Sequence, residues 1–303
     1  MKTYAVVLGT NSIDEYYEID TIPVMGEKII CTHLDDKVGG MLGNAAAVLA
    51  GFGSKTYMID VINDGVYGQM IQAEMHRNGI DASFCTVDPS IADSRCLILL
   101  KDGERLIAVI PNNKKGVVFS AAQTELLLGA EYLYTTVSEL RALKSVEDFL
   151  VKAKEAGVKL ALDIEPGTLM EKEFGWFVLS HSDILFINQG GSEKMRQLYG
   201  DFEDRLFGSD CTLVYTRGKD GCEVHQRKEK VAEIRGMRVP VVDTTGAGDT
   251  FNASFLFGLL NKWSLTKCAE FANGAAARSI GALGPRTGVT DEQQVWDFIS
   301  RYS

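Results

Sequence analysis

Residues Val241–Leu260 read VVDTTGAGDTFNASFLFGLL and join a glycine turn to an apolar helix, with a carboxylate at the junction. Gly246 and Gly248 permit positive backbone φ angles and let the main chain come close to a ligand. From about Asp249 onward the apolar residues recur at helical spacing, which predicts an amphipathic helix. The free N–H groups at the start of such a helix, together with its dipole, favour a bound anion such as a phosphate.

Asp249 stands at this helix start, where its negative charge would repel a phosphate. A carboxylate in that place makes chemical sense if it accepts the proton of a hydroxyl group that attacks the phosphate. The alternative is that Asp249 only caps the helix, because aspartate is a favoured N-cap residue. The local sequence leaves both interpretations open.

The string Asp243–Phe251, DTTGAGDTF, closely resembles the C-terminal signature of the ribokinase-like (PfkB) carbohydrate kinase family. The resemblance implies that Asp249 is the catalytic base. It also implies that the backbone amides of Gly246, Ala247 and Gly248 form an anion hole for the phosphate that is transferred. The similarity to this family extends along nearly the whole chain.

A second glycine-rich segment, Val38–Asn44 (VGGMLGN), precedes a run of small residues that predicts a helix. Gly39 and Gly40 allow close approach of the backbone, and Asn44 is placed at the expected helix start. The segment resembles the family's GG-x-x-x-N loop, which implies that these three residues contact the substrate; a tight helix entry is the alternative. Met41 stands where several sugar kinases of the family carry a basic residue, so a ribokinase-like substrate does not carry over directly.

Two further residues are candidates for substrate binding. Asp14 follows the predicted first strand, Tyr4–Leu8, at the edge where open α/β sheets bind ligands. The family has an aspartate at the matching place that hydrogen-bonds sugar hydroxyls, whereas the local sequence also fits a turn residue. Arg95 begins a predicted strand and could bind a phosphate or carboxylate of the substrate, or lie exposed.

The expected nucleotide site rests on three features of the second half of the chain. Thr216, Gly218 and Gly221 form a T-x-G-x-x-G pattern that lines the nucleotide in the family and that also fits a tight hairpin. Asn273 resembles a family position near the adenine. The loop 281–289 contains several glycines and is expected to close over the base. ATP is therefore the expected phosphoryl donor.

The metal-binding motifs that the resemblance implies match this sequence less closely than the two glycine-rich segments do. Asn188 would begin the family's N-x-x-E motif, which organises the water shell of Mg2+. Gly191 stands where the glutamate should be and Glu193 follows two residues later, so either Glu193 replaces it or ATP and water hold the metal. Asp243 is implied to bind a monovalent cation such as potassium, and bracing the glycine turn is its alternative role.

The elements that must position these residues follow a βαβ rhythm from Ser120 onward. This alternation predicts a parallel sheet that is covered on both faces. Polar residues follow the predicted strands, which is where an open α/β sheet places its ligand site. The expected fold class is α/β, with a doubly wound, mostly parallel sheet, helices on both faces and a single domain over residues 1–303.

Four segments outside this rhythm predict a small β-sheet. They are Glu15–Asp20, Glu27–Leu34, Arg95–Leu100 and Arg105–Ile110. The last two flank an Asp-Gly turn, which predicts a hairpin. We join the four as a lid formed by excursions at about 15–37 and 91–113. In the family such a lid closes over the sugar and often forms a dimer contact, which predicts a homodimer.

The composition excludes several other classes of protein. The hydrophobic share of 46% and the charged share of 24% are those of an ordinary globular protein. The formal net charge of −10 argues against nucleic acid or a membrane surface as partners. Neither a signal peptide nor a membrane span is apparent in the sequence. The six cysteines form no CxxC pair, which predicts reduced thiols in a cytoplasmic protein.

Together these features predict an ATP-dependent phosphotransferase that acts on a hydroxyl of a small sugar or sugar-like substrate. A nucleoside kinase on the same scaffold would share every feature on the phosphate side and would differ only in the substrate pocket. A non-catalytic sensor of sugars or nucleotides is the third interpretation, and the intact Asp249 and glycine turn argue against it.

Overall fold

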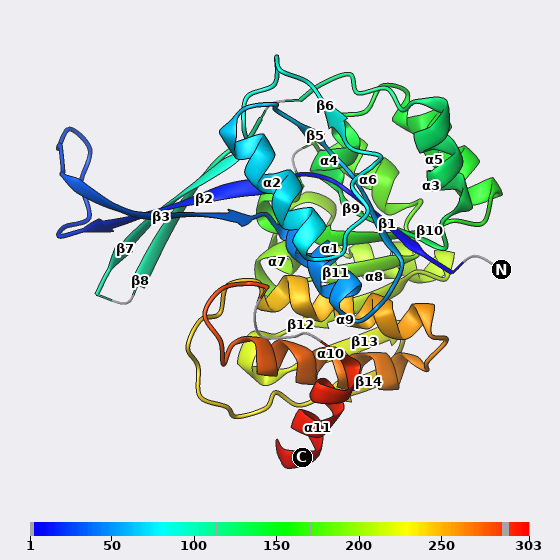
Figure 1. Ribbon diagram of the computed structural model, residues 1–303. Helices are drawn as coiled ribbons and strands as arrows, with labels where there is room; N and C mark the ends of the chain where they lie inside the picture. The colour runs from blue at the N-terminus through cyan, green and yellow to red at the C-terminus, as the bar shows by residue number, and fades with distance from the viewer. Residues whose placement is uncertain (1–2, 103, 113, 170, 287–290, 303) are drawn as a thin grey trace.

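The computed structural model describes residues 3–102, 104–112, 114–169, 171–286 and 291–302. Its largest element is an eight-stranded sheet (Figure 1). The strands in spatial order are β14 (Glu229–Ile234), β13 (Cys222–Gln226), β12 (Thr212–Thr216), β11 (Ile184–Ile187), β10 (Lys159–Ile164), β9 (Tyr132–Thr136), β1 (Ala5–Leu8) and β4 (Thr56–Ile59). The strands from β12 to β4 run parallel, whereas β13 and β14 are antiparallel additions at one edge.

Helices cover both faces of this sheet, and each face has its own apolar core. One face carries α1 (Met41–Gly51), α2 (Val66–Arg77), α9 (Ala247–Leu260), α10 (Leu265–Ser279) and α11 (Glu292–Tyr302). The other carries α3 (Ala121–Gly129), α4 (Val137–Arg141), α5 (Val146–Glu155), α6 (Lys172–Leu179), α7 (Gln189–Tyr199) and α8 (Phe202–Leu206). The central strands are buried on both sides, as parallel strands usually are. The predicted fold class is confirmed.

A separate four-stranded sheet extends from one side of the body, at the left of Figure 1. Its strands in order are β3 (Cys31–Gly39), β2 (Ser12–Ile19), β7 (Arg95–Lys101) and β8 (Glu104–Ile110). The predicted hairpin is β7–β8, but β2 begins before Glu15, and β3 overlaps the predicted segment Glu27–Leu34 only from Cys31 onward and continues to Gly39. Only Gly9, Thr10 and Asn11 separate β1 from β2, so the chain passes directly from the large sheet into the small one. A third pairing joins the short strands β5 (Val61–Ile62) and β6 (Thr86–Val87).

Two helices differ from the sequence-based expectation. Helix α9 begins at Ala247 and is not amphipathic, because Thr250–Gly258 are all buried. It packs between α1 and α10 on the sheet, and a helix that is enclosed on every side is apolar all round. Helix α1 begins at Met41, so Asn44 lies within its first turn rather than before it. Among the described residues, no helix combines the length and hydrophobicity that crossing a membrane requires.

Candidate active site

The glycine turn before α9 presents an uncapped helix N-terminus. Gly246 is the N-cap residue with φ +74°, and no side chain makes a capping hydrogen bond there. Gly248 does not adopt a positive φ, contrary to the expectation for both glycines. A Cβ atom added at Gly248 would meet nothing within 4 Å, so open space lies beside it. The start of α9 therefore offers backbone donors and positive dipole potential next to a space that an anion can enter.

Asp249 is the third residue of α9 and does not cap the helix. Its Oδ2 accepts a hydrogen bond of 2.7 Å from Nδ2 of Asn44 on α1. Burial raises the pKa of Asp249 to about 7, and the Asn44 hydrogen bond opposes this rise. The negative charges of Glu165 and Asp14 raise the pKa further, whereas the nearby Arg286 lowers it. A carboxyl group with a pKa near neutrality is suited to proton transfer.

The predicted substrate loop lies beside this carboxylate. Gly40 has φ +96° at the N-cap of α1, and a Cβ atom there would lie 2.8 Å from the backbone N of Ser12. Position 40 therefore requires glycine, whereas a Cβ atom at Gly39 would lie 2.3 Å from Oδ2 of Asp14 and would displace that carboxylate. Asp14 is buried, and desolvation raises its pKa. The fold thus brings Asp14, Gly39, Gly40 and Asn44 together next to Asp249.

Arg95 is placed differently from the other predicted substrate residues. It forms an ion pair of 3.1 Å with the buried Glu15, whose Oε1 also accepts a hydrogen bond of 3.1 Å from the Tyr67 hydroxyl. Asp14 and Cys96 are register partners, and successive strand residues point to opposite faces. Arg95 and Glu15 therefore lie on the opposite face of the small sheet from Asp14. The predicted role of Arg95 in binding an anionic substrate stays a prediction.

The predicted nucleotide loop is the tight turn that joins β12 to β13. Gly218 and Gly221 both adopt positive φ angles, of 54° and 93°. A Cβ atom at Gly221 would lie 1.9 Å from the carbonyl oxygen of Ile234, so the hairpin also needs this glycine. Thr216 ends β12 at the carboxyl edge of the sheet. Asn273 is buried on α10 and donates to the carbonyl oxygen of Arg235 at 3.0 Å.

The region expected to organise magnesium contains an acid that the sequence analysis missed. Asn188 caps α7, with its Oδ1 accepting from the Gly191 amide at 2.7 Å. Its Nδ2 donates to Oε1 of Glu165 at 3.1 Å. Glu193 is exposed and pairs with Gln189, so it does not take the place of the missing glutamate beside Asn188. The only sequence signal for Glu165 is its position directly after β10, at the same carboxyl edge of the sheet.

Asp243 braces the turn that precedes α9. Its Oδ1 accepts hydrogen bonds from the backbone N and the Oγ1 of Thr245, at 2.8 and 2.6 Å, and its Oδ2 accepts from the Gly284 amide at 3.0 Å. Arg105 on β8 adds an ion pair of 3.2 Å. Burial alone would raise the pKa of Asp243, but these donors and the arginine lower it. Within the described ranges, no group of three or more histidine, cysteine or acidic side chains is arranged to hold a metal ion.

Arg286 was also missed, because a single arginine in a loop carries no pattern. The loop 281–289 was expected to lie over the base of ATP; Gly288 and its neighbours at 287–290 are outside the described residues. The described part places Pro285 against the glycine turn, since a Cβ atom at Gly246 would lie 2.4 Å from that of Pro285. Arg286 then reaches Asn44 on the substrate side, with Nε donating to Oδ1 at 2.9 Å.

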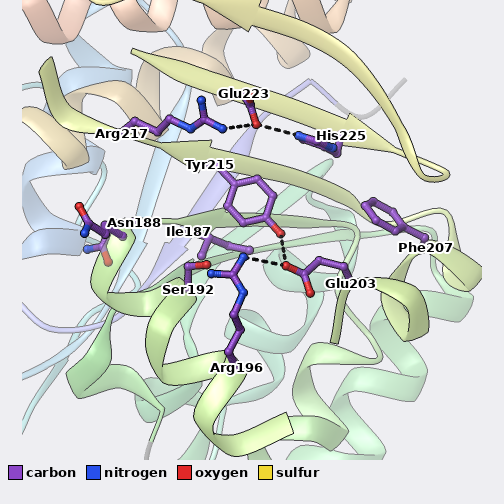
Figure 2. A pocket seen from close by; sticks show the side chains of 11 residues that line it. Ile187, Asn188, Ser192, Arg196, Glu203, Phe207, Tyr215, Arg217, Glu223 and His225 are labelled. Carbon is purple, nitrogen blue, oxygen red and sulfur yellow. Dashed lines mark hydrogen bonds and ion pairs between the residues drawn. The ribbon is translucent and has the colours of Figure 1, made fainter. Parts of the chain in front are cut away.

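A cavity of about 460 Å³ adjoins Asn188 and lies between α7, α8 and the hairpin β12–β13. Figure 2 shows the side chains that line it. Its charged side chains are already paired. Arg196 contacts Glu203 at 3.2 Å, and Arg217 contacts Glu223. We therefore assign no separate anion site to this cavity, which reaches Arg217 in the predicted nucleotide turn.

Comparison with known proteins identifies the family. Residues 2–292 match the pfkB family carbohydrate kinase description. Ribokinase from Bacillus subtilis (strain 168) is 24% identical over 296 residues, which cover 97% of this chain and 98% of the relative. The solved structure of Arabidopsis thaliana ribokinase complexed with ribose and ATP has a TM-score of 0.82 at 24% identity, with 99% of each chain covered. A protein from E. coli solved in complex with ATP and Mg2+ has a TM-score of 0.80 at 17% identity, again with 99% of each chain covered. The chain belongs to the pfkB family of carbohydrate kinases.

Proposed function

We propose that this kinase transfers the γ-phosphoryl group of ATP to a hydroxyl of a small sugar-like substrate, with Asp249 as the general base. One observation carries the proposal. Asp249 lies at an uncapped helix N-terminus beside open space, and Asn44 of the substrate loop holds one of its oxygens. The second oxygen is then the one that accepts the proton of the attacking hydroxyl.

The amides of Gly246, Ala247 and Gly248 are the proposed anion hole. Backbone donors aimed at the transferring group, together with the dipole of α9, stabilise the charge on its oxygens without reorganisation. Because an alcohol holds its proton far more tightly than a carboxyl group does, proton transfer to Asp249 occurs late, as the new P–O bond forms. Alignment and charge stabilisation therefore supply most of the rate acceleration.

The sugar is proposed to bind between Asp14, Gly39, Gly40 and Asn44. Close packing at both glycines supports this position, because the main chain there can approach a ligand that a side chain would exclude. The buried Asp14 carboxylate suits hydrogen bonds from sugar hydroxyls. The small sheet, which carries Asp14 on β2, is proposed to act as the lid of a single catalytic domain.

ATP is proposed to lie along the Thr216–Gly221 turn and α10. Two structural neighbours were solved with ATP, one of them together with Mg2+, which supports both ligands for this chain. The half-buried carboxylate of Glu165, beside the Asn188 amide, fits Mg2+, which prefers oxygen ligands and retains several waters. Bound magnesium would neutralise charge on the phosphates. Potassium at Asp243 stays a prediction, because both carboxylate oxygens already accept hydrogen bonds, and omission of potassium from the assay tests it.

The small sheet is also the proposed homodimer contact. Strand β8 exposes apolar side chains on both faces of the small sheet, with Ile107 and Val109 on one face and Leu106 and Ile110 on the other. Exposed apolar side chains that gather on one element commonly mark an interface between proteins. Light scattering should give twice the chain mass for the wild type, and a monomer for the double variant with lysine at 107 and 109; a monomeric wild type would contradict the proposal. All six cysteines are free thiols, which supports a cytoplasmic location.

The experiment that tests the proposed function is ADP release with Mg-ATP across pentoses, hexoses, sugar phosphates, sugar acids and nucleosides. Turnover on a sugar class supports the proposal and defines the acceptor. Turnover on a purine nucleoside where all sugars fail would select the nucleoside kinase alternative. The absence of turnover together with the absence of ATP binding would refute the proposal.

A further inference from the structure

Arg286 occupies a buried position next to the proposed base, with only 6% of its side chain exposed. Its Nε donates to Oδ1 of Asn44 at 2.9 Å, and its Nη2 donates to the carbonyl oxygen of Gly39 at 3.1 Å. Its Nη1 lies 4.0 Å from Oε1 of Glu74 on α2. This side chain therefore connects the loop after α10 to the substrate loop, to α1 and to α2.

The backbone near Arg286 is shaped to admit it. A Cβ atom at Gly43 would lie 2.8 Å from Nη2 of Arg286 and 2.2 Å from Oδ1 of Asn11. Any larger residue at position 43 would displace the guanidinium from its two acceptors. Glycine at this point of α1 leaves the room that the arginine fills.

The hydrogen bonds of Arg286 fix the orientation of the Asn44 amide. An arginine only donates hydrogen bonds, so the Asn44 atom that faces it must be the oxygen. The amide nitrogen of Asn44 must then face Asp249, to which it donates at 2.7 Å. Without the guanidinium, the hydrogen bond to Asp249 alone would hold the Asn44 amide in this orientation, and the amide oxygen would lose its donor.

We propose that Arg286 is a positioning residue for the general base: it fixes the Asn44 amide so that Asp249 is held through one oxygen, and its positive charge favours the ionised carboxylate. The inference rests on the proposed function, because it concerns the same proton transfer. It adds a residue from the C-terminal loop to the machinery of the substrate side. Two hydrogen bonds connect Arg286 to Asn44 and Asn44 to Asp249, so the arginine acts on the base without touching the substrate.

The charged groups around Asp249 shift the pKa of its carboxyl group, and Arg286 is one of them. The groups that face Asp249 from neighbouring elements are Asn44 on α1, Asp14 on β2, Tyr134 on β9, Asp163 on β10, and Glu165 after β10. The negative charges of Asp14 and Glu165 raise the pKa of Asp249, and the positive charge of Arg286 opposes them. Removal of that charge would leave less of the base ionised at neutral pH.

Two variants separate charge from geometry. Arg286→Gln removes the charge but keeps an amide donor, so the pKa of Asp249 should rise by about one unit, the lower end of the usual effect of a close cation. In a plot of kcat against pH, the fall in kcat on the acid side (the acid limb) should then move to higher pH by the same amount. Arg286→Lys keeps the charge but loses the planar guanidinium with its several N–H donors. The acid limb should therefore stay at the wild-type pH while kcat falls about tenfold. Arg141→Gln, which alters an exposed arginine on α4 that pairs with Glu171 at 3.1 Å, is the matched control and should leave the profile unchanged.

An acid limb that stays in place in Arg286→Gln, or that moves equally in both variants, would overturn the proposal. The melting temperature and ATP affinity of each variant show whether the fold is intact. If Arg286→Gln does not fold, the lysine variant with a limb shifted by a full unit would overturn the electrostatic part by itself. A further readout is independent of turnover: the pKa of the Asp249 carboxyl, measured by 13C NMR in the wild type and in Arg286→Gln. A wild type without kinase activity would refute the proposed function, whereas an NMR pKa unchanged by the substitution would refute the role of Arg286.

Discussion

Replacement of Gly248 by alanine should separate the stability of α9 from its function. Gly248 is exposed in the first turn of the helix, has an ordinary helical φ, and would place an added Cβ in open space. Nothing in the protein resists the methyl group. If the open space is where the transferring phosphate sits, the same methyl group blocks the ligand instead.

The substitution should leave the stability of the protein unchanged or slightly raised, and it should lower the catalytic rate. Glycine in a helix is less stable than alanine by about 0.5–1 kcal/mol, so Gly248→Ala should melt at the wild-type temperature or slightly above. Displacement of the phosphate from its backbone donors should lower kcat by about 10²–10³-fold, as the loss of an anion-hole donor does. Gly246→Ala provides the contrast. Its φ of +74° and the 2.4 Å approach to Cβ of Pro285 should lower the melting temperature clearly, with a backbone cost of about 1–2 kcal/mol before the clash is counted.

The assay combines thermal melting with ADP release on whichever substrate the panel identifies. Circular dichroism gives the melting temperature of each variant, and steady-state kinetics give kcat and KM. A Gly248→Ala enzyme that keeps kcat within about threefold of the wild type would fall far short of the usual anion-hole effect and would refute the assignment. An alanine variant that melts well below the wild type would refute the steric argument.

Three further predictions concern the same site. Because the pKa of Asp249 is about 7 and the ionised form is the base, kcat should be full above that pH and fall below it; a pH profile from 5 to 9 with no acid limb would contradict this. Gly39→Ala should raise the KM for the sugar more than it lowers kcat, because its Cβ would lie 2.3 Å from the Asp14 carboxylate; equal KM values would contradict the sugar site. Arg105→Gln should raise the KM for the sugar and leave ATP binding unchanged, because Arg105 links β8 to Asp243 in the turn; titration calorimetry with ATP checks the second half.

The sequence predicted what local signals determine. The first strand β1, the Asp-Gly hairpin β7–β8 and the glycine turn before α9 each depend on neighbouring residues, and all three were located. The burial of α9 on every side was not predicted. That burial depends on α1 and α10, which reach the helix only through the tertiary fold.

The candidate site residues that belong to sequence motifs were named from the sequence. The residues that only the tertiary fold brings to the site were missed. Glu165 is an ordinary acidic residue in the sequence and becomes notable only because β10 and β11 place it beside Asn188. Arg286 belongs to no motif and is 242 residues away from its partner Asn44. Arg95 also belongs to no motif: the pleat of β7 turns it to the face opposite Asp14, and its contact with a ligand stays a prediction.

The account depends most on Asp249, and the variant Asp249→Asn tests it directly. Asparagine keeps the shape and can still accept the Asn44 hydrogen bond, but it cannot take a proton from the substrate. Asp297→Asn, at an exposed carboxylate on α11, is the matched control and should retain wild-type kinetics. We predict that Asp249→Asn binds ATP as the wild type does and loses at least about 10²-fold in kcat, the usual effect of removing a general base. If it kept more than about a tenth of the wild-type kcat, well short of that effect, Asp249 would not be the base.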